Sequence, residues 1–105
     1  MIDQTTITQA AELLQQAAAP EKIILFGSYA RNGADAGSDV DLLVIESTVS
    51  DTAAEMVRLM RVLSPLRIPA DVLVVSRQEF NDWSDTPGHI LCEAAREGVI
   101  LYEAA

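Results

Sequence analysis

Three aspartates have the residue type and the spacing needed to hold a divalent cation. Asp39 and Asp41 stand two residues apart in the segment 38–41. Side chains at this spacing in a strand point to the same face, about 6.6 Å apart along the backbone. Asp71 opens another apolar segment, residues 72–75, and carboxylate oxygens are ligands that Mg²⁺ prefers. The pattern predicts a magnesium site, provided that the two segments lie side by side.

A Gly-Ser pair follows a third apolar segment, residues 22–26, and is suited to bind phosphate. Gly27 allows close approach to the backbone, and the N–H groups of a helical turn after it can receive an anion. Ser28 adds a hydroxyl donor. The segment therefore predicts a turn that binds phosphate or another anion.

Each of these features also has an ordinary structural explanation. Most Gly-Ser pairs after a strand are simple turns, and aspartates at the start of a strand are often solvated. Without a metal, however, two carboxylates on one face repel each other, and their placement at the start of a buried strand is costly. Together, the three features favour a functional site over three unrelated surface positions.

Apolar spacing, proline and glycine predict the elements that position these residues. We expect helices over 6–18, 51–63, from Ser76 and over 88–97, a helical turn over 28–31, and strands over 22–26, 40–45, 70–75 and 99–102. Thr5 or Thr6 is expected to cap the first helix, and Thr86 the last. Helices that alternate with strands predict the α/β (α+β) class, with a small mixed β-sheet and helices packed against it.

The helix over 51–63 is expected to be amphipathic, with one face toward the core. The residues expected on the inward face are Ala53, Met56, Val57, Met60 and Leu63. The residues expected on the outward face are Glu55, Arg58 and Arg61.

Composition limits the class of protein. The chain has 105 residues, 50% of them hydrophobic, which predicts one folded domain over residues 1–105. No apolar run is long enough to span a bilayer, and the first residues lack the order of a secretory signal, so we expect a cytoplasmic protein without membrane contact. Sixteen acidic against seven basic residues give a net charge of −9. That charge repels a phosphate backbone and argues against long DNA or RNA as a ligand.

The residues singled out above also match a known family. Gly27-Ser28, ten further residues, and Asp39-Val40-Asp41 reproduce the nucleotidyltransferase signature of the DNA polymerase β-like superfamily. The longer segments 27–31 and 38–44 resemble its minimal nucleotidyltransferase (MNT) branch, and the closing segment 96–102 resembles that branch too. Asn32 departs from the usual glycine and residues 33–37 carry no basic side chain; asparagine tolerates left-handed backbone angles, so we expect the loop to keep its course.

The resemblance implies a reaction and a role for each residue. Members of the branch transfer a nucleoside monophosphate, here AMP from ATP, to a hydroxyl group. Two magnesium ions assist the transfer. By resemblance, Asp39 and Asp41 hold the ion that binds ATP, and both of them with Asp71 hold the second ion. Asp71 is also implied to receive the hydroxyl proton. Gly27 and Ser28 are implied to bind the triphosphate, and Arg31 to add positive charge near it, although a structural ion pair explains Arg31 equally well.

The acceptor is less well defined by the sequence. Proteins of the MNT branch are typically encoded beside a HEPN protein, an all-helical ribonuclease toxin. The resemblance therefore implies the antitoxin of a HEPN/MNT toxin–antitoxin pair, which adenylylates a tyrosine of its toxin. The alternatives are an antitoxin that acts by binding alone and the catalytic subunit of a small-molecule nucleotidyltransferase. The sequence leaves these alternatives open, as it does the self-association of the chain.

Overall fold

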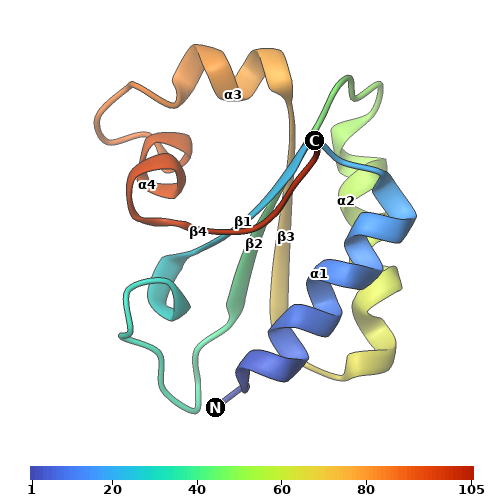
Figure 1. Ribbon diagram of the computed structural model, residues 1–105, viewed down its shortest axis with the longest axis vertical. Helices are drawn as coiled ribbons and strands as arrows, with labels where there is room; N and C mark the ends of the chain where they lie inside the picture. Colours follow the sequence, from blue (N-terminus) through green and yellow to red (C-terminus); the bar gives the residue numbers. More distant parts are fainter.

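The computed structural model describes all 105 residues, in which helices and strands alternate (Figure 1). The elements are α1 (Gln4–Ala18), β1 (Lys22–Phe26), β2 (Val40–Glu46), α2 (Thr52–Leu63), β3 (Ala70–Ser76), α3 (Arg77–Trp83), α4 (Ile90–Glu97) and β4 (Val99–Glu103). Single 3₁₀ turns follow β1, at Gly27–Tyr29, and α2, at Ser64–Leu66. Every helix and strand expected from the sequence is present. None of the helices combines the length and the apolar character needed to cross a membrane.

The strands form one mixed sheet in the order β3-β2-β1-β4. β1 pairs antiparallel with both β2 and β4, whereas β2 and β3 run parallel. Parallel neighbours need a long crossover connection, and α2 provides it here. The expected fold class, a small mixed sheet with helices packed against it, is confirmed. β3 and β4 are the free edges of this sheet.

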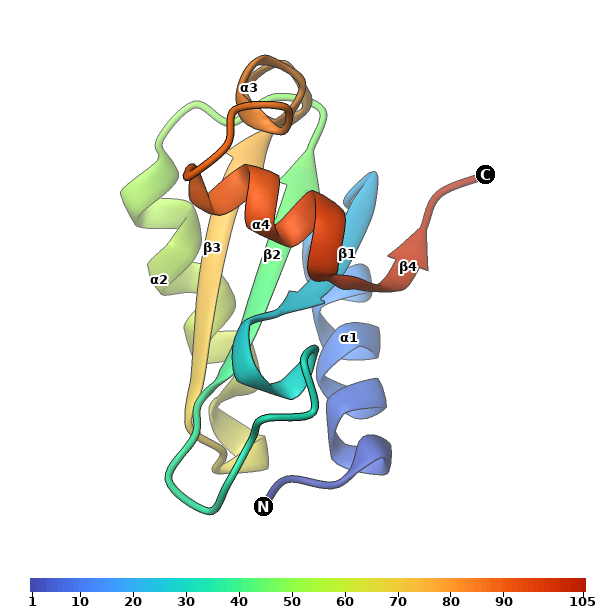
Figure 2. The ribbon, with the colours of Figure 1, turned by 90° about the vertical axis from the view of Figure 1, so that its left-hand side faces the viewer.

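Helices cover both faces of the sheet (Figures 1 and 2). Leu42 and Val44 of β2 are buried in the core shared with α1 and α2. Leu43 and Ile45 are buried in the core shared with α4. Coverage on both faces explains why β2 is apolar without alternation. The alternation of side chains then places Asp41 on the α4 side of the sheet, together with Leu43.

α1 begins at a cap other than the threonine expected. Asp3 precedes the helix, and its carboxylate accepts a hydrogen bond from the Thr6 N–H at 2.9 Å. A carboxylate at this position caps the helix and also interacts favourably with its dipole. The expectation of a Thr5 or Thr6 cap is therefore wrong, because the helix starts at Gln4, two residues before the start expected from the sequence.

α4 also begins later than expected. His89 caps it, because the His89 Nδ1 accepts a hydrogen bond from the Leu91 N–H at 3.0 Å. The expected cap, Thr86, cannot start the helix, because Gly88 has φ +88°, far from helical angles. The His89 ring also stacks on Trp83, with ring centroids 5.1 Å apart, and so joins α3 to the start of α4.

α2 buries a narrower stripe than the sequence suggested. Leu59 and Leu63 are buried and Met56 is half-buried, at a spacing of three and four residues. On the outer side, Val57 is 50% exposed and Met60 is 42% exposed. Because α2 packs only against the sheet and one neighbouring helix, only part of its broad apolar face is buried. The residues wrongly expected in the core are Ala53, Val57 and Met60.

Glu46 at the end of β2 and Glu55 of α2 form an acidic pair. Arg58 donates to the Glu55 carboxylate at 2.7 and 2.8 Å and to the Ala17 carbonyl oxygen at 3.1 Å. The hydrogen bond from Arg58 lowers the pKa of Glu55 to about 2. Burial, helped by the neighbouring Glu55 carboxylate, raises the pKa of Glu46 to about 7. The Glu46 Oε2 atom is buried without a hydrogen-bond partner, so its neutral form is favoured.

Replacing Glu46 with glutamine should stabilise the fold at pH 8 and change it little at pH 5. The pKa of Glu46 is higher in the folded state than the usual 4.5, so its contribution is fully present below pH 4.5 and is lost as the pH rises through about 7. Glutamine stays neutral throughout, and we expect a gain of ~1 kcal/mol in the free energy of unfolding at pH 8. Thermal melts at both pH values test this, with Glu12→Gln on the exposed face of α1 as the charge control. An equal effect at pH 5 and pH 8 would contradict it.

Candidate active site

The starts of the parallel strands bring two of the predicted acids side by side. Asp41 of β2 and Asp71 of β3 are register partners, and partners in register point to the same face of a sheet. Asp71 is exposed and Asp41 is half-buried. The two segments therefore lie side by side, as the predicted metal site requires.

The turn after β1 brings Gly27 against this pair. Phe26 at the end of β1 pairs with Asp41 in the antiparallel ladder, and the 3₁₀ turn follows directly. Gly27 has φ +73°, and a Cβ at this position would overlap the carboxylate of Asp41. Both the backbone conformation and the close approach exclude a side chain here. The predicted phosphate-binding turn and the predicted acids thus share one place.

Backbone hydrogen bonds close the loop that continues from this turn. The Arg31 N–H donates to the carbonyl oxygens of Gly27 and Ser28, both at 3.2 Å, and the Gly33 N–H donates to Ser28 at 2.9 Å. Asn32 has φ +58°, so the left-handed conformation expected at this position is confirmed. Asn32 therefore adopts a backbone conformation that is otherwise typical of glycine.

A pocket of about 560 Å³ joins these residues. Its polar lining is Gly27, Ser28, Arg31, Asp41, Asp71 and Glu93. Its apolar lining is Phe26, Met56, Met60, Val72, Leu73 and Ile90. Of the predicted site residues, Asp39 alone does not line the pocket; it is exposed and precedes the first residue of β2. A volume of this size suits a small-molecule ligand.

Sequence reasoning missed the four residues of this lining that lie on helices. Met56 and Met60 were assigned to the core by their spacing, and Ile90 and Glu93 lie on α4, far along the chain from the motif. No local motif marks these residues. Ile90 and Glu93 do stand three residues apart and so share one face of α4, but only the packing of α4 over the sheet turns that face toward the acids.

Arg31 reaches from the turn to α4. Its guanidinium lies 3.6 Å from the Glu93 carboxylate and 3.5 Å from that of Glu97. The structural ion pair, one of the two interpretations of this arginine, is therefore present. The same side chain is 47% exposed and lines the pocket, and contact with phosphate remains a prediction. Ion pairs this exposed contribute little to stability, so they leave the guanidinium able to exchange partners.

Negative charge accumulates around Asp41. Burial raises the pKa of Asp41, and the charges of Asp71, Asp39 and Glu93 raise it further, while Arg31 lowers it. The like charges therefore oppose one another at this end of the sheet. A bound divalent cation would relieve the repulsion and favour the ionised form of every carboxylate near it.

The acids alone do not enclose a metal ion. No group of three or more acidic, histidine or cysteine side chains lies close enough together to hold one. Mg²⁺, however, is commonly bound by one or two carboxylates, with waters and substrate phosphates as its other ligands. Asp41 and Asp71, adjacent in register and open to the pocket, fit a site of that kind.

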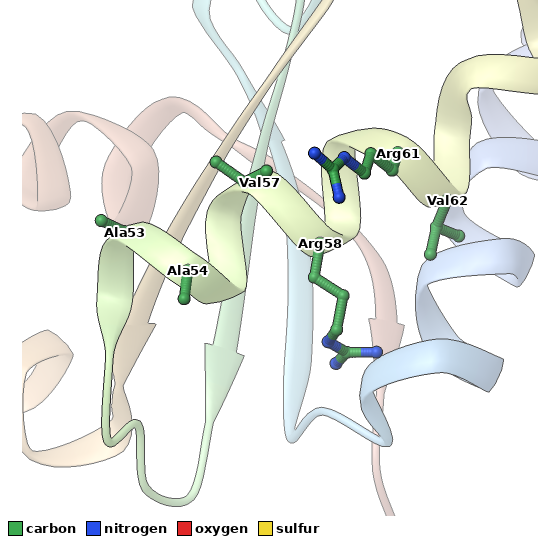
Figure 3. Close-up of a pocket in the computed structure, with 6 residues that line it drawn as sticks. All are labelled: Ala53, Ala54, Val57, Arg58, Arg61 and Val62. Atoms are coloured by element: carbon green, nitrogen blue, oxygen red, sulfur yellow. The ribbon is translucent and has the colours of Figure 1, made fainter.

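A second hollow lies on the outer side of α2 (Figure 3). It measures about 660 Å³ and is lined by Ala53, Ala54, Val57, Arg58, Arg61 and Val62. Figure 3 shows the Arg58 side chain directed toward α1, where it reaches the Ala17 carbonyl oxygen. The hollow contains no carboxylate and therefore lacks the ligands that Mg²⁺ prefers. Asp41, Asp71 and the turn at Gly27 line the pocket of about 560 Å³ instead.

A mixed sheet in the order β3-β2-β1-β4, covered by helices, is the fold of a nucleotidyltransferase domain. The chain belongs to the polymerase β nucleotidyltransferase family, whose family model, described as "Polymerase beta, Nucleotidyltransferase", matches residues 8–105. No curated protein matches the sequence at a significant level.

Solved structures share this fold. A toxin–antitoxin complex with AMP-PNP has a TM-score of 0.65 and 22% identity, over 92% of this chain and 73% of that chain. A tri-AMPylated HEPN toxin in complex with MNT antitoxin, from Shewanella oneidensis, gives a TM-score of 0.64 and 21% identity, over 98% and 74%. A nucleotidyltransferase structure from Sulfolobus solfataricus gives 0.61 and 18%, over 94% and 78%. At these identities the likeness establishes the fold.

Proposed function

We propose that this nucleotidyltransferase uses magnesium to transfer AMP from ATP to a hydroxyl of a partner protein, a tyrosine of a HEPN-type toxin. The observation that carries the proposal is the register pair Asp41 and Asp71 beside the Gly27 turn, all within one pocket. Two carboxylates and a phosphate-binding turn are the parts that phosphoryl-type transfer requires, because its catalysis consists mainly of positioning and charge stabilisation.

Each residue of the site has a role in the proposed reaction that follows from its position. Asp41, with Asp39 just before β2, would hold the ion that accompanies the triphosphate, and Asp71 together with these two acids would hold the second ion. Gly27 and Ser28 would orient the phosphates. Asp71 stands at the open side of the pocket and takes the proton of the acceptor hydroxyl. Magnesium, as two ions, supplies positive charge to the attacking and leaving oxygens when bound.

The bonds that change define the reaction. The acceptor oxygen forms a bond to the α-phosphorus of ATP, and the bond between that phosphorus and the bridging oxygen to the β-phosphate breaks. Pyrophosphate leaves with the electron pair of the broken bond, and the hydroxyl proton passes to Asp71. The products are an AMP–protein ester and pyrophosphate, and no oxidant or reductant is needed.

The toxin partner is supported by likeness and by charge. One structure with this fold is an AMPylated HEPN toxin bound to its MNT antitoxin, and another contains the ATP analogue AMP-PNP. The net charge of −9 favours association with a basic partner. The pocket of about 560 Å³ is of a size that suits a small-molecule ligand such as a nucleotide, and in this proposal the partner presents the acceptor hydroxyl.

Incubation with ATP labelled at the α-phosphate, magnesium and a HEPN-type protein should leave label on a tyrosine of that protein. Asp41→Asn should lower the transfer rate by about 100-fold or more, because it removes a metal-binding charge. Glu12→Gln, exposed on α1, is the control and should transfer normally. Neutralisation of the toxin without label would favour the antitoxin that acts by binding alone. Label on a small-molecule hydroxyl instead would favour the small-molecule enzyme.

A further inference from the structure

The free edge of β3 can pair with another strand. β3 lies at one end of the sheet, and its seven residues pair with β2 in a regular parallel register. The other edge strand, β4, has a register shift in its pairing with β1. Edge strands without bulges, prolines or lysines present unpaired N–H and C=O groups that can bind an additional strand. β3 contains no proline, lysine or register shift, and Asp71 is its only charged residue.

The hydrogen-bonding pattern between β2 and β3 identifies which backbone N–H and C=O groups of β3 are unpaired. The Val40 N–H donates to the Pro69 carbonyl oxygen at 2.9 Å, so this carbonyl points toward β2. In a parallel ladder the N–H and C=O of alternate residues point to the same neighbour. Residues 71, 73 and 75 therefore face β2, whereas Ala70, Val72 and Val74 direct their N–H and C=O groups away from the sheet.

The pocket with the acids extends around this same edge. Its lining combines Met56 and Met60 of α2, on one face of the sheet, with Leu73 and Ile90, on the other. Met60 is 42% exposed and Ile90 is 48% exposed. Figure 2 shows α2 and α4 on the two sides of β3, which runs between them. An apolar surface thus flanks the unpaired edge on both faces and continues into the acidic site.

We infer that an extended segment of the partner protein adds to the edge of β3 as a further strand and thereby places its acceptor hydroxyl beside Asp71. The inference rests on the proposed function, because the hydroxyl is the group that receives AMP. Main-chain hydrogen bonds to Ala70, Val72 and Val74 supply affinity, and side chains in alternation supply specificity, as in other cases of strand addition.

The alternation of the added strand predicts what the segment contains. A residue in register with Asp71 directs its side chain to the face of Asp71, where the hydroxyl is needed. The residue opposite Val72 points to the other face, toward Met56 and Met60. The residue opposite Leu73 points toward Ile90. The partner segment therefore contains a residue with a hydroxyl group next to apolar residues. The negative charges of Asp41, Asp71 and Glu93 favour basic residues around that hydroxyl residue.

Amide hydrogen exchange, residue by residue, tests the docking mode directly. In the free protein the amides of residues 71, 73 and 75 should exchange slowly and those of Ala70, Val72 and Val74 quickly. A HEPN-type partner should slow the second set by at least about tenfold, while the outer amides of β4 stay unchanged. Protection of β4 alone, or no added protection in β3, would overturn the inference. Because this readout needs no chemistry, protection without AMP transfer would support the docking and refute the proposed reaction.

A matched pair of variants tests the flanking surface. Met60→Gln combined with Ile90→Gln keeps the charge but makes both flanks polar, and should raise KM for the partner roughly tenfold with kcat nearly unchanged. Ile100→Gln alters a side chain on β4 that is 52% exposed and should leave both constants unchanged. Equal effects of the two changes, or a loss confined to kcat, would overturn the inference. Normal transfer without protection of β3 would likewise overturn the docking mode and leave the proposed function standing.

Discussion

Replacing Gly27 with alanine should abolish the response to magnesium and ATP while the protein stays folded. The backbone at this position has φ +73°, and the new Cβ would overlap the Asp41 carboxylate. Asp41 can turn aside at small cost to the fold, but its carboxylate then leaves the place where the metal is bound. We expect the rise in Tm with magnesium and ATP to disappear and AMP transfer to fall about 100-fold or more.

Gly88→Ala separates this effect from backbone strain. Gly88 has φ +88°, and nothing lies within 4 Å of a Cβ placed there. Both substitutions should cost the ~1–2 kcal/mol of a left-handed alanine, but only Gly27→Ala should lose the ligand response. Thermal melts with and without magnesium and ATP compare the two variants. An undiminished response in Gly27→Ala would show that the position of the Asp41 carboxylate does not matter to binding.

The part of the site that lies on strands could be predicted from the sequence. The apolar run before Gly27 and the run after Asp41 indicate buried strands, and alternation then assigns each acid to a face. Asp71 opens its strand as Asp41 does at the start of β2, so parallel pairing alone brings the two acids into register. Local sequence was sufficient here, because the two-residue period of a strand and the position of its first residue determine where the two acidic side chains lie.

The part of the site that lies on helices could not be predicted in this way. α2 has more apolar residues than one buried stripe needs, and only contact with the sheet and α1 selects Leu59 and Leu63 over Val57 and Met60. Arg31 could be assigned to phosphate or to an ion pair until α4 placed Glu93 beside it. Packing between distant segments decides these questions, and no local pattern encodes it.

The conformation of single residues decided the helix starts. Thr86 and Pro87 have the residue types of a helix N-terminus, yet Gly88 at φ +88° delays the helix until His89 can cap it. That delay matters for the site, because Ile90 then becomes the first residue of α4 and is left exposed at the edge of the pocket. The free surface beside β3 is thus a consequence of a turn that composition alone does not reveal.

Asp71→Asn should bind ATP with magnesium almost as well as the natural protein but transfer AMP far more slowly. Asp71 is exposed at the open side of the pocket, whereas Asp41 lies against Gly27. An interaction with the acceptor hydroxyl matters mainly in the transition state, so its loss lowers turnover and not nucleotide affinity. Loss of a positioned base costs on the order of 10²–10⁴-fold in rate.

Electrostatics predicts a further difference between Asp71→Asn and Asp41→Asn. The charge of Asp71 is one cause of the raised pKa of Asp41, so Asp71→Asn should leave Asp41 more readily ionised and at least as able to bind a metal. Asp41→Asn removes the ligand itself and should lose both affinity and turnover. Isothermal titration of nucleotide, paired with a transfer assay on the same preparations, distinguishes the two variants. If Asp71→Asn loses nucleotide affinity as severely as Asp41→Asn, then Asp71 is a metal ligand first, and the hydroxyl proton must go elsewhere.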